Sequence, residues 1–278
     1  NDKLIKKKRR LFIFINIFGI QAYNTTHEIF KQVEQLCQKH GEYTCEYHDE
    51  ILVVDWNKHK GRHIVWNFNE HARELITGEL ALHMLYKIPE IKPDKRITII
   101  PVLNVWGRTR AFKNNCQRKN KNGVDINRNF WSENNHKKYK KHSEEYEGKT
   151  SISQKESILL AKILKDNTQR YINVHSGEFS IYMPYDSSFD HPPNYHIMKK
   201  NIELWSKHCP ECAVGPAAIT SFYRAYGTSV DWAIVNGIPE AYTFEIFGKN
   251  TWSCRSMFNP KKPGPVIQKW EKILKLTI

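Results

Sequence analysis

Residues 66–75 read WNFNEHAREL, and the HARE segment within them places His71 three residues before Glu74. The preceding residues 62–68, RHIVWNF, are mostly apolar and predict a short buried strand. The residues that follow, LITGELALHMLYK, carry apolar side chains at helical intervals. A strand that ends where a helix begins is the usual place for reactive side chains in α/β enzymes. This segment therefore predicts a catalytic or ligand-binding site.

The His-x-x-Glu spacing occurs four times in the chain. The copy at His142 lies in a charged stretch without apolar periodicity, and the copy at His208 contains Pro210, which indicates a turn. The copy at His175 follows an apolar strand but continues into small residues typical of a turn. We therefore interpret the copy at His71 as the candidate metal-binding pair.

Helical and extended patterns alternate along the chain. We predict helices near residues 26–40, 73–86, 153–166, 194–208, 227–237 and 265–276, and strands at 50–56, 62–68, 96–103, 170–175, 179–185 and 240–247. This alternation predicts an α/β fold with a mixed, mostly parallel central sheet and helices on both faces. The 278 residues contain 40% hydrophobic side chains and no repeat or linker, so we expect one domain over residues 23–278.

Residues 1–22 have the layout of a secretory signal segment. Six basic residues lie within the first ten positions, followed by the apolar run LFIFINIFGI and then Gln21 and Ala22. Ten apolar residues are too few to cross a bilayer, which takes about twenty. A first strand with a basic lead is the alternative. We expect a secreted or luminal protein without stable membrane insertion.

The six cysteines agree with export. They can form up to three disulfides with fifteen possible connectivities, among which the sequence does not choose. Cys209 and Cys212 resemble half of a zinc site, but the sequence has no second C-x-x-C. Asn24-Thr25-Thr26 is an acceptor pattern for N-glycosylation.

Three further segments offer chemistry. A catalytic zinc takes three protein ligands and leaves one position open, and His175 at the end of a predicted strand is a candidate third ligand. Glu245 is a candidate to take a proton from water, and the adjacent Asn127 and Arg128 can bind a carboxylate. Pattern alone also fits a hydrogen-bonded core histidine, a solvated glutamate and a solvated loop.

Taken together, these segments resemble the zinc carboxypeptidases of the carboxypeptidase A/B type. H-x-x-E, an Asn-Gly turn, an arginine, D-x-N-R-N, a strand-end histidine and a late glutamate occur in the family's order, and the likeness runs from about Tyr23 to the C-terminus. The resemblance implies a three-layer α/β/α fold and one Zn²⁺ per chain, held by His71, Glu74 and His175. It also implies that Glu245 is the general base.

The resemblance assigns substrate contacts as well. Arg73 would face the substrate chain upstream of the cut, Asn127 and Arg128 would clamp the terminal carboxylate, and Tyr223 would close over the substrate. Arg118 would stabilise the oxyanion, with Lys113 as the alternative. Val230 falls where basic-specific members carry an acid, which implies an apolar or aromatic C-terminal residue.

The sequence departs from the family pattern in three features. The N-P-x-G turn is Asn104-Val105-Trp106-Gly107, a tyrosine is replaced by Gly177, and we expect no activation segment before the domain. The expected activity is zinc-dependent removal of single residues from peptide C-termini, by a monomer.

Two other functions remain open at this stage. One is a zinc amidohydrolase that acts on small acylated amino acids. The other is a non-catalytic basic domain, because the formal charge is +14 and residues 137–142 read KKYKKH. We do not expect nucleic acid to be a partner, because such a charge run is usually a solvated loop.

Overall fold

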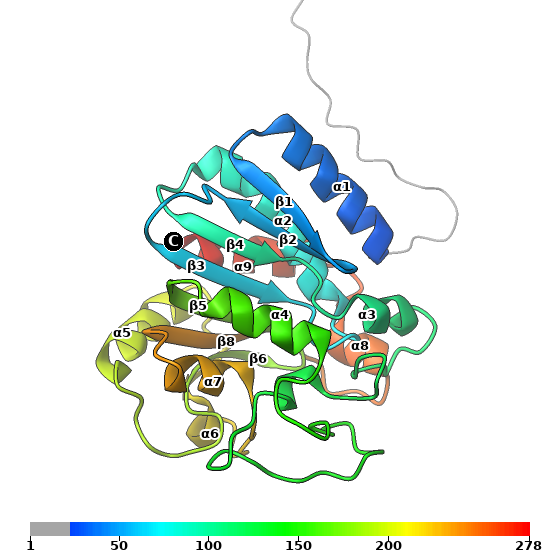
Figure 1. Ribbon diagram of the computed structural model, residues 1–278, viewed down its shortest axis with the longest axis vertical. Coiled ribbons are helices and arrows are strands. Elements are labelled where there is room, and N and C mark those ends of the chain that lie inside the picture. The colour runs from blue at the N-terminus through cyan, green and yellow to red at the C-terminus, as the bar shows by residue number, and fades with distance from the viewer. Residues whose placement is uncertain (1–22) are drawn as a thin grey trace, which may run out of the picture.

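The computed structural model describes residues 23–278, so the predicted signal segment lies outside the described residues. One eight-stranded sheet has the order β1-β2-β4-β3-β5-β8-β6-β7 (Figure 1). The strands are β1 (Tyr43–His48), β2 (Ile51–Trp56), β3 (His63–Phe68), β4 (Arg96–Ile100), β5 (Thr168–His175), β6 (Phe179–Met183), β7 (Ala213–Pro216) and β8 (Glu240–Ile246). Pairs β3–β4, β3–β5, β5–β8 and β6–β7 are parallel, and the others are antiparallel. The prediction of a mixed, mostly parallel sheet is confirmed.

Helices cover both faces of this sheet. They are α1 (Thr26–Lys39), α2 (Leu75–Ile91), α3 (Val105–Ala111), α4 (Lys155–Leu164), α5 (Tyr195–Ser206), α6 (Ala217–Thr220), α7 (Ser229–Val235), α8 (Cys254–Phe258) and α9 (Gly264–Lys275). In Figure 1, α4 and α7 lie in front of the sheet and α9 lies behind it, where it contacts α2. Within residues 23–278, none of the helices has both the length and the apolar character needed to cross a bilayer.

The central strands are buried on both faces. Every residue of β2 and β3 is buried, including Trp66 and Phe68, because helices pack on either side. Strand β8 differs at its C-terminal half, where buried Phe244 and Ile246 alternate with partly exposed Thr243 and Glu245. The alternation therefore directs Thr243 and Glu245 away from the core and toward one side of the sheet.

Several boundaries differ from the predictions. Helix α2 begins at Leu75, so HARE is a turn rather than the first helical turn, and the helix continues past Tyr86 to Ile91. Helix α4 spans Lys155–Leu164 rather than residues 153–166, and its N-cap Gln154 forms a capping box with Ser157. Strands β1 and β7 and the short helices α3, α6 and α8 were not predicted. These elements are short, and their periodicity is correspondingly weak.

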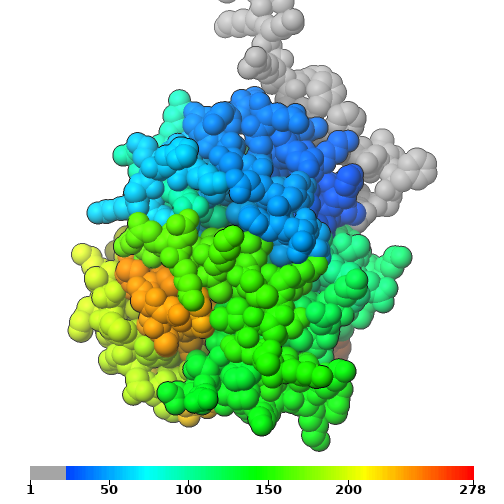
Figure 2. Space-filling model, in the orientation of Figure 1, coloured from blue at the N-terminus to red at the C-terminus, as the bar shows by residue number. Residues whose placement is uncertain are grey.

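The polar stretch between β4 and α4 has little regular structure. It contains α3 and the 3₁₀ turn Ile126–Arg128, and it packs as loops over the ends of the strands. Figure 2 shows the green segment, which includes this stretch and α4, covering the middle and lower part of the visible face. The basic run at residues 137–142 lies here as irregular chain, in agreement with the interpretation of a solvated loop.

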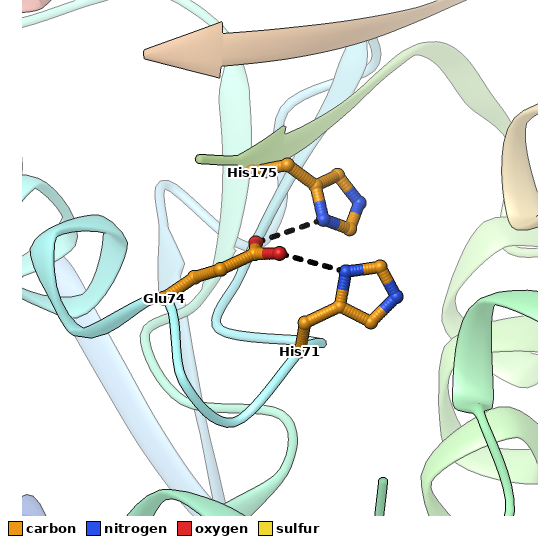
Figure 3. A group of neighbouring side chains, drawn as sticks. All are labelled: His71, Glu74 and His175. Atoms are coloured by element: carbon orange, nitrogen blue, oxygen red, sulfur yellow. Dashed lines mark hydrogen bonds and ion pairs between the residues drawn. The ribbon is translucent and has the colours of Figure 1, made fainter. Parts of the chain in front are cut away.

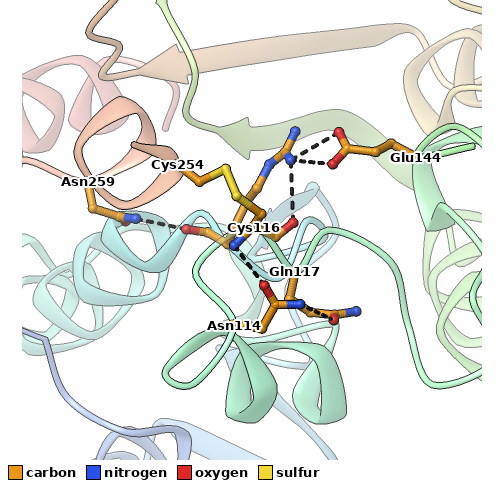
Figure 4. Close-up of a disulfide and its surroundings, with 7 residues drawn as sticks. Asn114, Cys116, Gln117, Glu144, Cys254 and Asn259 are labelled. Atoms are coloured by element: carbon orange, nitrogen blue, oxygen red, sulfur yellow. Dashed lines mark hydrogen bonds and ion pairs between the residues drawn. A yellow bond between two sulfur atoms is a disulfide. The ribbon is translucent and has the colours of Figure 1, made fainter. Parts of the chain in front are cut away.

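The six cysteines form three disulfides, as predicted: Cys37–Cys45, Cys116–Cys254 and Cys209–Cys212. The second of these joins the long polar loop to α8 (Figure 4). Next to it, Glu144 accepts hydrogen bonds from Arg73, and Asn259 donates to the Arg73 carbonyl at 2.8 Å. This disulfide therefore ties together segments on opposite sides of the HARE turn.

We expect the double substitution Cys116→Ser and Cys254→Ser to lower the free energy of unfolding by about 2–5 kcal/mol, because it releases a long closed loop in the unfolded chain. The matched control replaces Cys209 and Cys212, which are separated by 3 positions rather than 138. Urea denaturation of the oxidised proteins measures both. Equal losses in the two variants would contradict an origin in loop closure.

Candidate metal centre and substrate cleft

Three ligand-type side chains converge where parallel strands β3 and β5 end side by side (Figure 3). His71 lies in the turn after β3, Glu74 directly precedes α2, and His175 is the last residue of β5. The His71 Nδ1 and His175 Nδ1 atoms lie 2.8 and 3.0 Å from the two carboxylate oxygens of Glu74. All three ligand atoms lie within 4.8 Å of one another.

These residues fit a zinc ion. Two imidazole nitrogens and one carboxylate form a ligand set that leaves a coordination position open. Burial alone would raise the pKa of Glu74, but His71 and His175 together hold that pKa well below its usual value, so the carboxylate is an anion at neutral pH. Over residues 23–278, no other group of three such side chains comes this close together.

Each histidine has a carboxylate on its far side. The Nε2 atom of His71 lies 3.1 Å from Asp125 Oδ1, and the Nε2 atom of His175 lies 3.4 Å from Glu70 Oε2. Burial would raise the pKa of Asp125, but Arg118 and His71 hold it well below its usual value. Such outer carboxylates fix the orientation of metal-binding imidazoles.

Arg118 reaches the site through an anchored loop. Its Nε and Nη2 atoms donate to Asp125 Oδ2 at 2.9 and 2.7 Å. Its backbone oxygen accepts from the Ala72 amide at 3.1 Å and from Asn104 Nδ2 at 3.3 Å. Arg118 lines the cleft beside the metal centre, whereas Lys113 is exposed and is not part of the described lining.

The altered turn at Asn104 explains part of this anchoring. Asn104 Oδ1 accepts from the Gly107 amide at 3.0 Å and so caps α3. A Cβ atom at Gly107 would lie 2.7 Å from the Ala72 side chain, closer than real contacts allow. The first and last residues of the turn are therefore the ones that this packing requires, and Val105 replaces the family's proline without affecting either contact.

Glu245 lies directly opposite His175 in the β5–β8 pairing. Burial, and then the nearby Glu74 carboxylate, raise the pKa of Glu245 well above its usual value. Its Oε2 atom has no hydrogen-bond partner among the described residues. A Cβ atom at Gly177 would lie 3.6 Å from that oxygen, so the glycine leaves space next to it. The carboxyl group is thus free to contact a bound molecule.

Asn127 and Arg128 lie on the 3₁₀ turn at the other side of the cleft. The cleft has a volume of about 270 Å³, and its lining includes His71, Glu74, Arg118, Asn127, Arg128, His175, Asp186, Tyr223 and Glu245. Arg128 Nη2 lies 3.1 Å from Glu145 Oε1, and the Tyr223 hydroxyl donates to the same oxygen. An acidic side chain of the chain itself therefore contacts the predicted carboxylate-binding arginine.

The remaining two predicted contacts lie outside this lining. Arg73 packs over the ring of Phe258 at 4.3 Å and pairs with Glu144 at 2.9 Å. Val230 is only 1% exposed in α7. The described lining contains Asp186, which the sequence analysis did not select.

Residues 48–272 match the family model described as zinc carboxypeptidase. The chain belongs to the zinc carboxypeptidase family. It is 27% identical to human carboxypeptidase A5 over 86% of this chain and 63% of that protein. It is 30% identical to rat carboxypeptidase B over 65% of this chain and 46% of that protein. The chain thus spans less than two thirds of the length of these curated relatives.

Solved structures show the same fold. Bovine thrombin-activatable fibrinolysis inhibitor, solved in complex with tick carboxypeptidase inhibitor, superposes with a TM-score of 0.80 and 22% identity, over 91% of this chain and 95% of that chain. Carboxypeptidase A from Helicoverpa armigera gives a TM-score of 0.78 and 20% identity, over 92% of this chain and 73% of that chain. The predicted carboxypeptidase-like α/β/α architecture is therefore confirmed.

For this zinc carboxypeptidase chain, we expect one zinc ion per molecule after dialysis against zinc and gel filtration. Replacing His175 by Ala should abolish stoichiometric binding, because two remaining side chains rarely hold zinc. His208→Ala, at an exposed histidine, is the matched control. Metal analysis of both variants by mass spectrometry tests the ligand set. Full zinc content in the His175 variant would contradict it.

Proposed function

We propose that this protein is a zinc-dependent metallocarboxypeptidase that hydrolyses the C-terminal peptide bond of peptides and proteins. One observation carries the proposal: the His71, Glu74 and His175 cluster shares a cleft with Glu245 and with the Asn127–Arg128 pair. A metal centre, a proton acceptor and a carboxylate-binding arginine are the three groups that such a reaction needs.

Zinc, when bound at this centre, supplies Lewis acidity toward a carbonyl oxygen and a water molecule. Glu245 accepts the proton that water loses and delivers it to the leaving amine. Burial, and then the nearby Glu74 carboxylate, raise the pKa of Glu245, and this direction of shift favours uptake of a proton by the carboxylate. The Arg118 guanidinium, oriented by Asp125, provides donors for the developing oxyanion.

The requirement for a free C-terminus comes from the other end of the cleft. Arg128 offers a planar pair of donors that matches a carboxylate, and Asn127 adds a further donor. In this role the substrate carboxylate takes the place of Glu145 on Arg128, and Tyr223 moves with it. This requirement makes the enzyme an exopeptidase. Arg73 would contact the substrate chain upstream of the cut.

Two residues bear on the preferred C-terminal side chain. Val230 supports our proposal of an apolar or aromatic preference, because valine cannot pair with a cation. Asp186 favours a second candidate, a Lys or Arg side chain, because its carboxyl group lines the cleft. Burial, then repulsion from Asp231, raise the pKa of Asp186 to about 7, so the group is largely neutral in mildly acidic solution.

We propose a secreted or luminal setting and a peptide or protein as the partner. The three disulfides support an oxidising compartment. An amidohydrolase acting on small acylated amino acids uses similar ligands, and comparison of a peptide with an N-acyl amino acid distinguishes the two. A buried cluster of potential metal ligands gives no support to the alternative of a non-catalytic basic domain.

Incubation of the zinc-loaded protein with peptides ending in Phe, Leu, Lys or Glu tests the activity. We expect release of single C-terminal residues, inhibition by a metal chelator, and no cleavage of peptides with an amidated C-terminus. Glu245→Gln should lower kcat by about 10²–10⁴-fold while the zinc content stays unchanged, since only the proton acceptor is lost. Chelator-resistant trimming, or full activity of the glutamine variant, would overturn the assignment.

The pH dependence of side-chain preference tests Asp186. The carboxyl group is mostly protonated below pH 7 and mostly ionised above it, while Asp231, Arg128 and His175 are its charged neighbours. We expect the ratio of kcat/KM for Lys-ending over Phe-ending peptides to rise about tenfold from pH 6 to pH 8, in step with the ionised fraction. Asp186→Asn should remove this rise. A flat ratio in the unmodified protein would leave Val230 as the determinant.

A further inference from the structure

Glu70 is a buried acid to which neither the resemblance nor the proposed reaction assigns a role. It precedes His71 in the turn after β3, and its side chain is inaccessible to solvent. Asn69, with φ of 55°, adopts the left-handed conformation that asparagine tolerates, and the chain turns there between β3 and His71. A buried carboxylate is costly unless donors or cations surround it. The identity of those neighbours therefore indicates what Glu70 does.

One neighbour is the zinc ligand His175. Its Nδ1 atom faces Glu74, as a metal-binding nitrogen would, so a neutral metal-bound ring must carry its proton on Nε2. Glu70 Oε2 lies 3.4 Å from that Nε2 atom, a charge-pair distance, and the Nε2 atom makes no hydrogen bond of standard geometry within the described residues. Glu70 thus lies next to the Nε2 atom of His175, and Asp125 lies next to the Nε2 atom of His71.

The other neighbour is Asn173, two residues before His175 on β5. Its Nδ2 group donates to Glu70 Oε2 at 2.5 Å and to Ser229 Oγ at 3.0 Å, while its Oδ1 atom accepts from Asn67 at 3.0 Å. Because Asn67 donates to Asn173 Oδ1, the Asn173 oxygen must face Asn67. This fixes the Asn173 amide with its NH₂ group toward Glu70 and Ser229.

The chain of contacts continues to the carboxylate clamp. Ser229 accepts from Asn173, so its own hydroxyl proton is available for Asn127 Oδ1 at 3.3 Å. The Ser229 backbone amide donates to the same Oδ1 atom at 3.0 Å. With its oxygen committed in this way, Asn127 presents its NH₂ group to the cleft that it lines. That is the group needed to bind a substrate carboxylate.

We propose that Glu70 is a positioning residue that holds the zinc ligand His175 and, through Asn173 and Ser229, orients the clamp amide of Asn127. The first role rests on the proposed zinc site and the second on the proposed peptidase activity. The two roles separate by chemistry. A glutamine at position 70 keeps an acceptor for Asn173 but loses the negative charge behind His175, whereas a methionine loses both.

Zinc affinity, measured by competition with a chromophoric chelator, tests the first role without any assay of activity. We expect Glu70→Gln to weaken zinc binding about 10–100-fold, the usual effect of removing an outer-shell partner. The matched control is Glu156→Gln, at a buried glutamate on α4 that accepts from Asn120. The control should bind zinc as the unmodified protein does. Equal affinities for the unmodified protein and Glu70→Gln would overturn the first role.

Peptide kinetics at saturating zinc test the second role. We expect Glu70→Gln to keep the KM of the unmodified protein, and Glu70→Met to raise KM several-fold because Asn127 is no longer oriented. Thermal unfolding of the zinc-free variants shows whether either is merely destabilised. Equal KM values in both variants would overturn the second role. An unmodified protein that binds zinc but cleaves no peptide would overturn the proposed peptidase while leaving the zinc-affinity result intact.

Discussion

The carboxylate of Glu74 lies between two imidazoles in a place that solvent does not reach. The surrounding fold must therefore hold both imidazoles next to this buried carboxylate. One of its partners, His175, lies 101 positions farther along the chain, so that contact can form only when β3 and β5 pair in parallel. The Ser176 amide donates to the same carboxylate at 3.1 Å. A slip of one residue in that pairing would point His175 to the opposite face of the sheet. The pairing register and the metal site are therefore specified together.

The arginines around the cleft differ in how deeply their acidic partners are buried. Arg118 is held by the fully buried Asp125, and breaking such a pair leaves an uncompensated buried charge. Arg128 instead contacts Glu145, whose side chain is 31% exposed. Solvent reaches the Glu145 side of this pair and screens it more than it screens the Arg118–Asp125 pair. In the proposed reaction a substrate carboxylate would replace Glu145, whereas Arg118 would stay paired with Asp125.

The sequence predicts the parts that depend on local pattern. The apolar run ending at Phe68 and the strand ending at His175 were both identified, and so was the order of the landmarks that carries the family resemblance. The pattern around Glu70 and Asp186 contains no such signal, since each is one acid in an irregular segment. Their roles depend on which distant side chain lies opposite. Asp125, by contrast, could have been identified from the sequence. It is the first residue of D-x-N-R-N and lies two residues before Asn127.

The net charge of the chain and the charge around the two histidines have opposite signs. The chain carries +14 overall, yet Glu70, Glu74, Asp125 and Glu245 surround the two histidines, and Arg118 is the cation that pairs with Asp125. Buried like charges repel strongly because little water screens them. Burial, and then repulsion from Glu74, raise the pKa of Glu245. A divalent cation between the histidines offsets the excess negative charge, so the site favours a metal for electrostatic reasons as well as for its ligand geometry.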